Sequence, residues 1–101
     1  MAQREELRQL IFQQVAAIPC GKVASYGQIA RLCGFPNHAR FVGRTMQTLP
    51  EHSKIPWHRV VNSQGKLSFP DGSPQFLLQK TLLQQEGIVF IGNKIARSDF
   101  Y

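Results

Sequence analysis

Glycine and proline interrupt this chain at short intervals, and this spacing limits every regular element to a few turns. The first interruptions are Pro19 and Gly21, followed by Gly34 and Pro36. Proline breaks a helix interior, and glycine adopts the left-handed backbone of turns and helix ends. The chain has 101 residues, enough for one hydrophobic core. We therefore expect a single domain over residues 1–101, made of short helices and small β elements.

Apolar residues at helical spacing predict a first helix over about residues 4–18, ended by Pro19 and Gly21. Its apolar positions are Leu7, Leu10, Ile11, Val15 and Ile18. Ser25 and Gln28 then form a capping-box pattern for a helix of about two turns, which ends at Gly34.

A third helix is expected over residues 38–49, with Asn37 as its N-cap. A short helix, a brief turn and a second helix over about 25–49 predict a helix-turn-helix. The apolar side of the third helix consists of Ala39, Val42, Met46 and Leu49, and the polar side of Arg40, Arg44 and Gln47. Ala39 and Gly43 are small and border the polar side, so a partner can approach the backbone closely. An ordinary solvated helix face is the alternative interpretation.

The second half of the chain predicts mixed elements. Pro56 ends the helical pattern, and Val60-Val61 indicates a short strand. Residues 62–65 are expected to form a turn, after which residues 66–69 run back along that strand. Ser73 and Pro74 then begin a helix that Gly87 ends. Its apolar positions include Leu78, Leu82 and Leu83. Residues 88–91 and Ile95, separated by Gly92-Asn93, predict a terminal hairpin.

The charge of the chain favours a polyanionic partner. Lys and Arg number 12 against 6 Asp and Glu, which gives a net charge of +6. No segment has the ~20 apolar residues that a membrane span needs. Cys20 and Cys33 fit a reducing compartment, and their spacing to His38, His52 and His58 matches no zinc pattern, so we expect no metal and no cofactor.

Three stretches, in this order, carry a family resemblance. They are 18–30 (IPCGKVASYGQIA), 39–43 (ARFVG) followed by Met46, and 55–61 (IPWHRVV), with a looser match to Leu82, Leu83, Glu86 and Gly87. Together they resemble the C-terminal domain of O6-alkylguanine-DNA alkyltransferases over most of the chain. The resemblance implies a mainly α, winged-helix-like domain whose helix-turn-helix binds DNA.

The resemblance breaks at the residue that carries the family's chemistry. The third stretch of the enzymes reads Pro-Cys-His-Arg-Val, and their cysteine thiolate takes the alkyl group from the base. Trp57 stands at that position here, and an indole offers no comparable nucleophile. His58 and Glu86 match the family's His and Glu, whereas Leu49 stands near the family's Asn. With a tryptophan at this position, the chain resembles the alkyltransferase-like proteins. The resemblance implies a protein that binds O6-alkylguanine in DNA without alkyl transfer and directs the lesion to nucleotide excision repair.

Carried over residue by residue, the resemblance implies a minor-groove interface and a lesion pocket. The expected DNA contacts are Tyr26, Ala39, Arg40, Gly43, Arg44 and Gln47. Arg40 matches the arginine that fills the space of an extruded nucleotide, and Tyr26 matches the tyrosine that helps to rotate it. The expected pocket residues are Tyr26, Met46, Trp57, His58, Arg59, Val60 and Leu67. Arg59 and Lys66 are interpreted as pocket or backbone contacts, and the loop 68–72 departs from the enzymes' pattern.

Three other functions compete with a lesion sensor. The first is an active alkyltransferase that uses Cys20 or Cys33, neither of which is in the matching position. The second is a helix-turn-helix transcription regulator, which normally binds undamaged DNA as a dimer; we expect a monomer. The third is a glycosylase that uses Glu86. The expected location is the cytoplasm, associated with the nucleoid, in a bacterium, or the nucleus in a eukaryote.

Overall fold

The computed structural model describes residues 2–49 and 53–101, and their elements alternate between helices and very short strands. In chain order they are α1 (Ala2–Ala16), β1 (Ala24–Ser25), α2 (Tyr26–Leu32), α3 (Ala39–Gln47), the 3₁₀ helix η1 (Trp57–Arg59), β2 (Val60–Val61), α4 (Pro74–Gln85), β3 (Phe90–Ile91), β4 (Lys94–Ile95) and η2 (Arg97–Asp99). The mainly α fold class is confirmed. Within the described residues, no helix has the length and apolarity needed to cross a bilayer.

The helix-turn-helix is formed by α2 and α3; both predicted ends of α2 are confirmed, whereas α3 is one residue shorter at its start and two residues shorter at its end than the predicted 38–49. The Ser25 hydroxyl accepts a hydrogen bond from the Gln28 backbone N–H, at 3.0 Å. Gly34 has φ +85°, and Phe35 N–H donates to the Ala30 carbonyl, which closes a Schellman ending. Asn37 as the N-cap of α3 is wrong. The helix begins one residue later, so His38 takes the N-cap position, without a side-chain cap.

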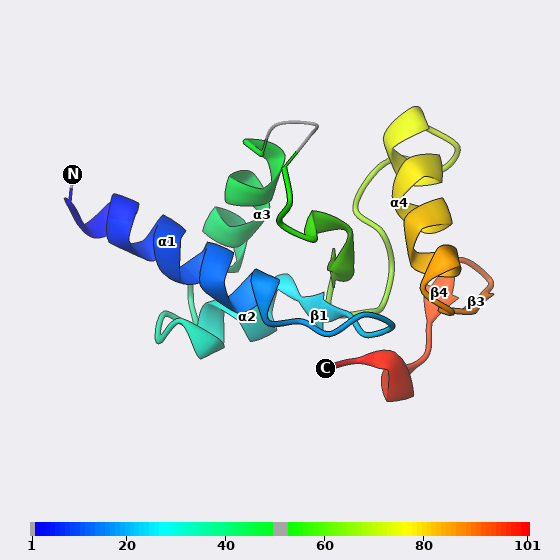
Figure 1. Ribbon diagram of the computed structural model, residues 1–101, viewed down its shortest axis with the longest axis horizontal. Helices are drawn as coiled ribbons and strands as arrows, with labels where there is room; N and C mark the ends of the chain where they lie inside the picture. Colours follow the sequence, from blue (N-terminus) through cyan, green and yellow to red (C-terminus); the bar gives the residue numbers. More distant parts are fainter. Residues whose placement is uncertain (1, 50–52) are drawn as a thin grey trace.

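Two hydrophobic clusters fill the interior. The first joins α1, α2 and α3 through Leu7, Ile11, Val15, Ile18, Ala24, Ile29, Ala30, Val42 and Val60. The second lies between the later elements and consists of Val23, Val61, Leu67, Phe76, Leu83, Ile88 and Ile95. Figure 1 shows α1 and α4 at opposite ends of the long axis, so each end of the molecule has its own core.

A two-stranded ladder connects the two clusters. β1 pairs in parallel with β2, with Ala24 opposite Val60 and Ser25 opposite Val61. Side chains alternate along a strand. Accordingly Ala24 and Val60 enter the first cluster, while Val23 and Val61 enter the second. The expected return of residues 66–69 as a strand is wrong, since the segment that pairs with β2 is β1.

Two predicted core positions are exposed in the structure. Leu10 on α1 is 37% exposed and Leu78 on α4 is 53% exposed, so neither belongs to the core. The buried positions on α4 are Phe76, Gln79 and Leu83. Ser73 and Pro74 do begin α4, and the hairpin of β3 and β4 turns through Gly92 and Asn93, both with positive φ. These two predictions are confirmed.

Candidate nucleic-acid interface

The polar face of α3 is open to solvent. Arg40, Arg44 and Gln47 are all exposed, whereas Val42 and Thr45 are buried. Ala39 and Met46 are half-buried along the inner side, as the periodicity predicts, and Leu49, also half-buried, lies beyond the end of the helix. The buried Thr45 hydroxyl donates to the Phe41 carbonyl at 2.8 Å, which satisfies it inside the helix. The helix therefore presents two guanidinium groups and an amide outward.

Gly43 on α3 faces Tyr26, the first residue of α2. A Cβ atom at this residue would lie 3.9 Å from two ring carbons of Tyr26, so the bare side of the glycine faces that ring. Tyr26 also packs against the first cluster and is half-buried. Gly43 thus packs against the Tyr26 ring, a contact that the sequence prediction did not include.

Trp57 opens the 3₁₀ turn η1 and is only partly buried. Its ring meets two aromatic neighbours edge to face. The Phe69 ring centroid is 6.4 Å away at an interplanar angle of 86°, and that of His58 is 6.0 Å away at 87°. Such pairs hold a ring in one orientation. Phe69 belongs to the loop that departs from the enzymes' pattern, and we did not predict its contact with Trp57.

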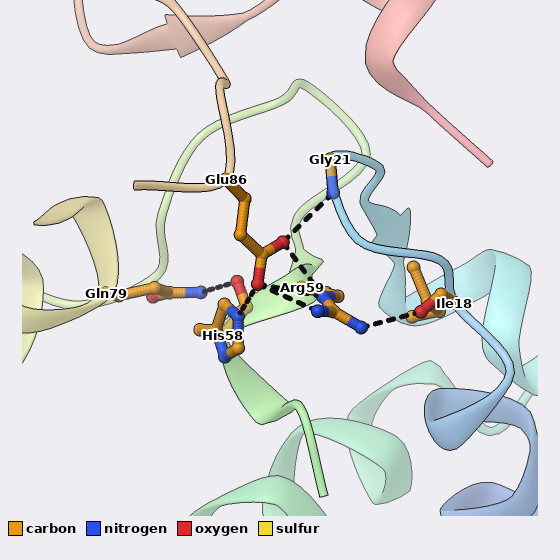
Figure 2. A network of polar contacts seen from close by, with 6 residues as sticks. All are labelled: Ile18, Gly21, His58, Arg59, Gln79 and Glu86. Atoms are coloured by element: carbon orange, nitrogen blue, oxygen red, sulfur yellow. Dashed lines mark hydrogen bonds and ion pairs between the residues drawn. The ribbon is translucent and has the colours of Figure 1, made fainter. Parts of the chain in front are cut away.

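Glu86 is the acceptor that ties η1 to the rest of the chain, as Figure 2 shows. His58 Nε2 lies 2.6 Å from Glu86 Oε2, and Arg59 donates to the same carboxylate through Nε at 2.9 Å and Nη2 at 2.8 Å. The Gly21 N–H donates to it at 3.1 Å, and Arg59 Nη1 reaches the Ile18 carbonyl at 2.8 Å. One carboxylate therefore fastens η1 both to the end of α4 and to the segment after α1.

The electrostatics of this cluster keep Glu86 ionised. Burial by itself raises the pKa of the carboxyl, but the hydrogen bonds from Arg59, His58 and the Gly21 N–H outweigh burial and lower the pKa to about 2. The hydrogen bond to Glu86 likewise raises the pKa of the Arg59 guanidinium, against the effect of its burial. A carboxylate held this firmly in its anionic form is poorly suited to the general-acid role that a glycosylase would need.

Gln79 completes the support of η1, and we did not predict it. Its side chain is buried on α4, and its amide donates to the His58 carbonyl at 3.0 Å and to the Val60 carbonyl at 3.1 Å. A glutamine between Phe76 and Leu83, at helical spacing on the apolar side, is the sequence signal that marks it. Buried polar side chains of this kind fix the backbone that they bond.

The predicted site residues lie in two groups, and a few others belong to the core. Tyr26 lies with Gly43 against α3, and Trp57, His58 and Arg59 lie together on η1. Among the described residues, no hydrogen bond, ion pair or aromatic contact joins the two groups. Val60 is 1% exposed and Leu67 is 7% exposed, so both are core residues in this structure. Lys66 is exposed, and Met46 is half-buried against the first cluster.

The two cysteines occupy different surroundings. Cys20 is exposed, and Cys33 is half-buried at the C-cap of α2. Burial raises the pKa of the Cys33 thiol, which lowers its thiolate fraction at neutral pH. Among the described residues no three His, Cys, Asp or Glu side chains are grouped to hold a metal ion, and His52 lies outside those residues.

Comparison with known proteins identifies the family. The sequence profile of the 6-O-methylguanine DNA methyltransferase, DNA binding domain, matches residues 6–88. A DNA base-flipping protein of Vibrio parahaemolyticus is 49% identical over 78 residues, covering 77% of this chain and 76% of its own length. Alkyltransferase-like protein 1 of Schizosaccharomyces pombe is 43% identical over 84 residues, covering 83% of this chain and 78% of its own length.

Solved structures agree with the sequence relatives. The crystal structure of the S. pombe protein in complex with damaged DNA containing O6-carboxymethylguanine superimposes with a TM-score of 0.86 and 36% identity, over 96% of this chain and 95% of that one. The Mycobacterium tuberculosis O6-methylguanine methyltransferase superimposes with a TM-score of 0.67 and 34% identity, over 78% of this chain and 47% of that one. The chain therefore belongs to the family of the 6-O-methylguanine DNA methyltransferase DNA-binding domain, among its alkyltransferase-like members.

Proposed function

We propose that this protein binds double-stranded DNA containing O6-alkylguanine, extrudes the damaged nucleotide, and retains it without removing the alkyl group. The observation that carries the proposal is the placement of Trp57. It opens η1 directly before His58 and Arg59, which both bond Glu86, and by the sequence resemblance it stands where the enzymes have their cysteine. In this proposal the scaffold of an alkyl acceptor is kept, and an indole takes the place of the accepting sulfur.

The contacts of Glu86 support a role in holding rather than reacting. In an acceptor enzyme, the histidine beside the cysteine helps to generate its thiolate. Here His58 bonds the carboxylate at 2.6 Å and Arg59 bonds it through two nitrogens, so both side chains are engaged with Glu86. The cluster instead fixes the backbone that presents Trp57. An aromatic face stacked on an extruded base contributes ~1–3 kcal/mol.

The surface of α3 supports the DNA half of the proposal. Arg40 and Arg44 are exposed one helical turn apart, and Tyr26 lies beside them on Gly43. In this proposal Arg40 occupies the space of the extruded nucleotide, and Tyr26 guides the rotated backbone. Extrusion costs a few kcal/mol and costs less for a poorly paired base, so a damaged guanine is selected.

The decisive measurement is binding to two matched duplexes, one with guanine and one with O6-methylguanine at the same position, at one salt concentration. We expect tighter binding to the damaged duplex and no alkyl group on the protein after incubation with alkyl-labelled DNA. Equal affinities would favour a transcription regulator instead. Label found on Cys20 or Cys33 would show an active alkyltransferase.

The Arg40→Ala variant separates extrusion from charge. We expect it to lower affinity for the damaged duplex by at least about tenfold, which is about 1.4 kcal/mol. Affinity for the undamaged duplex should fall much less, because Arg44 and the remaining cations still attract phosphates. Titration of both duplexes by fluorescence anisotropy measures the two losses, with Arg44→Ala as the control of equal charge. Equal losses on both duplexes would make Arg40 a simple phosphate contact.

The fate of the bound lesion is also part of the proposal. If the protein takes no alkyl group, as proposed, the complex would have to pass the lesion to other proteins. We propose nucleotide excision repair as the recipient, with the sensor bound as a monomer. Reconstituted incision of lesion DNA with and without this protein tests the first point. Sedimentation of the free protein and of the complex tests the second.

A further inference from the structure

A groove runs between α1 and α3. Its volume is about 800 Å³. Apolar side chains, including Leu7 and Phe41, line part of it, and the charged lining is mostly arginine. These arginines are Arg4 and Arg8 from α1, and Arg40 and Arg44 from α3. His38 and one acidic residue, Glu6, also line it.

The four arginines form two pairs on facing helices. Arg4 and Arg8 are four residues apart on α1, as Arg40 and Arg44 are on α3, and four residues rise about 6 Å along a helix. Each pair therefore points to one side of its helix. The exposed face of α3 and this side of α1 thus belong to one continuous basic surface rather than to two separate ones.

Arg8 is held in place at the edge of this surface. Its Nη1 donates to the Thr48 hydroxyl at the end of α3 at 3.3 Å, and its guanidinium lies 5.4 Å from the centre of the Phe12 ring. Glu5 approaches its Nε at 3.8 Å but is itself 68% exposed. A guanidinium has five N–H donors in a fixed plane. Arg8 therefore keeps donors for a further partner while its position is already restricted.

The charge of the groove is not neutralised from within. Among residues 4–49 and 53–101, Arg4, Arg40 and Arg44 form no ion pair, and Glu5 is the only carboxylate paired with Arg8. Four permanent positive charges thus face one Glu6 in the groove. A concave surface with an excess of one sign concentrates its electric field and attracts the opposite charge.

We propose that α1 is a second phosphate-binding element, in which Arg4 and Arg8 contact the DNA backbone beside the stretch that α3 occupies. The inference rests on the proposed function only in that the partner is DNA. An acidic peptide would need the same charges, but Arg40 and Arg44 already belong to the face assigned to DNA. Duplex DNA carries one negative charge per ~1.7 Å of its axis, so phosphates continue past α3 onto α1. These contacts are blind to sequence and to damage.

The test is the salt dependence of binding by an Arg4→Ala/Arg8→Ala double variant. The slope of log K against log salt is negative, and each lost phosphate contact makes it shallower by about 0.9. We therefore expect the slope of the double variant to be shallower than that of the wild type by about 1.8. The loss should be the same for undamaged and O6-methylguanine duplexes, which leaves their affinity ratio unchanged. The matched control is Lys94→Ala/Arg97→Ala, which removes two exposed cations from β4 and η2, and Figure 1 shows β4 at the end opposite α1.

Each outcome decides the matter. An unchanged slope in the α1 variant overturns the proposal. An equal fall in the control variant also overturns it, because net charge alone would then explain the effect. Arg8→Lys, which keeps the charge, should retain most of the slope, and thermal melting checks that Arg8 variants remain folded. If the wild type binds both duplexes equally, the sensor proposal fails while the α1 slope is still measured.

Discussion

The two ends of the molecule use arginine in opposite ways. In the helical end, Arg4, Arg40 and Arg44 are exposed around an apolar core and make no ion pair with a described residue. At η1, the Arg59 side chain is 17% exposed, and its guanidinium is bound by Glu86 and the Ile18 carbonyl. The first kind of arginine is available to a partner, and the second is part of the fold. Substitutions at the two ends should therefore affect different properties.

The largest contrast is expected between Glu86→Ala and Arg44→Ala. Removing the carboxylate leaves Arg59, His58 and the Gly21 N–H without their acceptor, and breaking such a partly buried cluster costs about 3 kcal/mol of unfolding free energy. Arg44→Ala should change that free energy by less than about 0.5 kcal/mol, as surface substitutions do. Urea denaturation of both variants measures the difference. Similar values would mean that the cluster adds little to stability.

Acid should weaken the η1 end before the helical end. The pKa of Glu86 is about 2 in the folded protein and 4.5 as an ordinary value. Because the folded pKa is the lower one, its stabilisation is fully present above about pH 4.5 and is lost as the pH falls towards 2. Melting temperatures measured from pH 6 to 2 should fall in this window. Glu86→Gln should flatten the fall, and an unchanged profile would point to other carboxylates.

Two aromatic pairs allow a smaller comparison. Phe69 meets Trp57 edge to face, and Phe35 meets His38 in the same manner on the exposed turn between α2 and α3. We expect Phe69→Leu to cost about 1 to 1.5 kcal/mol and to reduce the preference for the damaged duplex, because it frees the Trp57 ring. Phe35→Leu should cost less, since Phe35 is 43% exposed. Chemical denaturation and the two-duplex titration check both effects.

The smallest expected effects are at the two serine N-caps. Ser25 caps α2 through the Gln28 N–H at 3.0 Å, and Ser73 caps α4 through the Phe76 N–H at 3.2 Å. Alanine at either should cost about 1 kcal/mol. Ser25→Ala should also loosen Tyr26, the next residue, and so weaken DNA binding, whereas Ser73→Ala should leave it intact. If the two variants bind DNA with equal affinity, the Ser25 cap does not contribute to the DNA interface.

The helical end was largely predictable from the sequence because local rules determine it. The 3.6-residue period placed Arg40 and Arg44 outward and Val42 inward, and Ser25 and Gly34 marked the ends of α2. The errors there are also local. Leu10 fits the period but is 37% exposed, and Asn37 lost the cap position because α3 starts one residue later.

The η1 end was less predictable because contacts distant in sequence determine it. Glu86 bonds Arg59 across 27 residues, and no local pattern reports that distance. The parallel pairing of β2 with β1 replaced the expected return of 66–69, since two-residue strands carry almost no periodic signal. The family resemblance identified His58 and Glu86 as site residues. It did not identify Phe69, because the sequence of its loop differs from that of the enzymes.

The short ladder of β1 and β2 has a consequence for anyone who re-engineers this scaffold. Neighbouring residues of each strand enter different cores, so inserting or deleting one residue would turn Val60 and Val61, or Val23 and Ala24, toward the wrong interior. Both ends of the protein would then lose packing together. A different α3 or a different 68–72 loop can be grafted, provided that the number of residues through positions 23–25 and 60–61 is left unchanged.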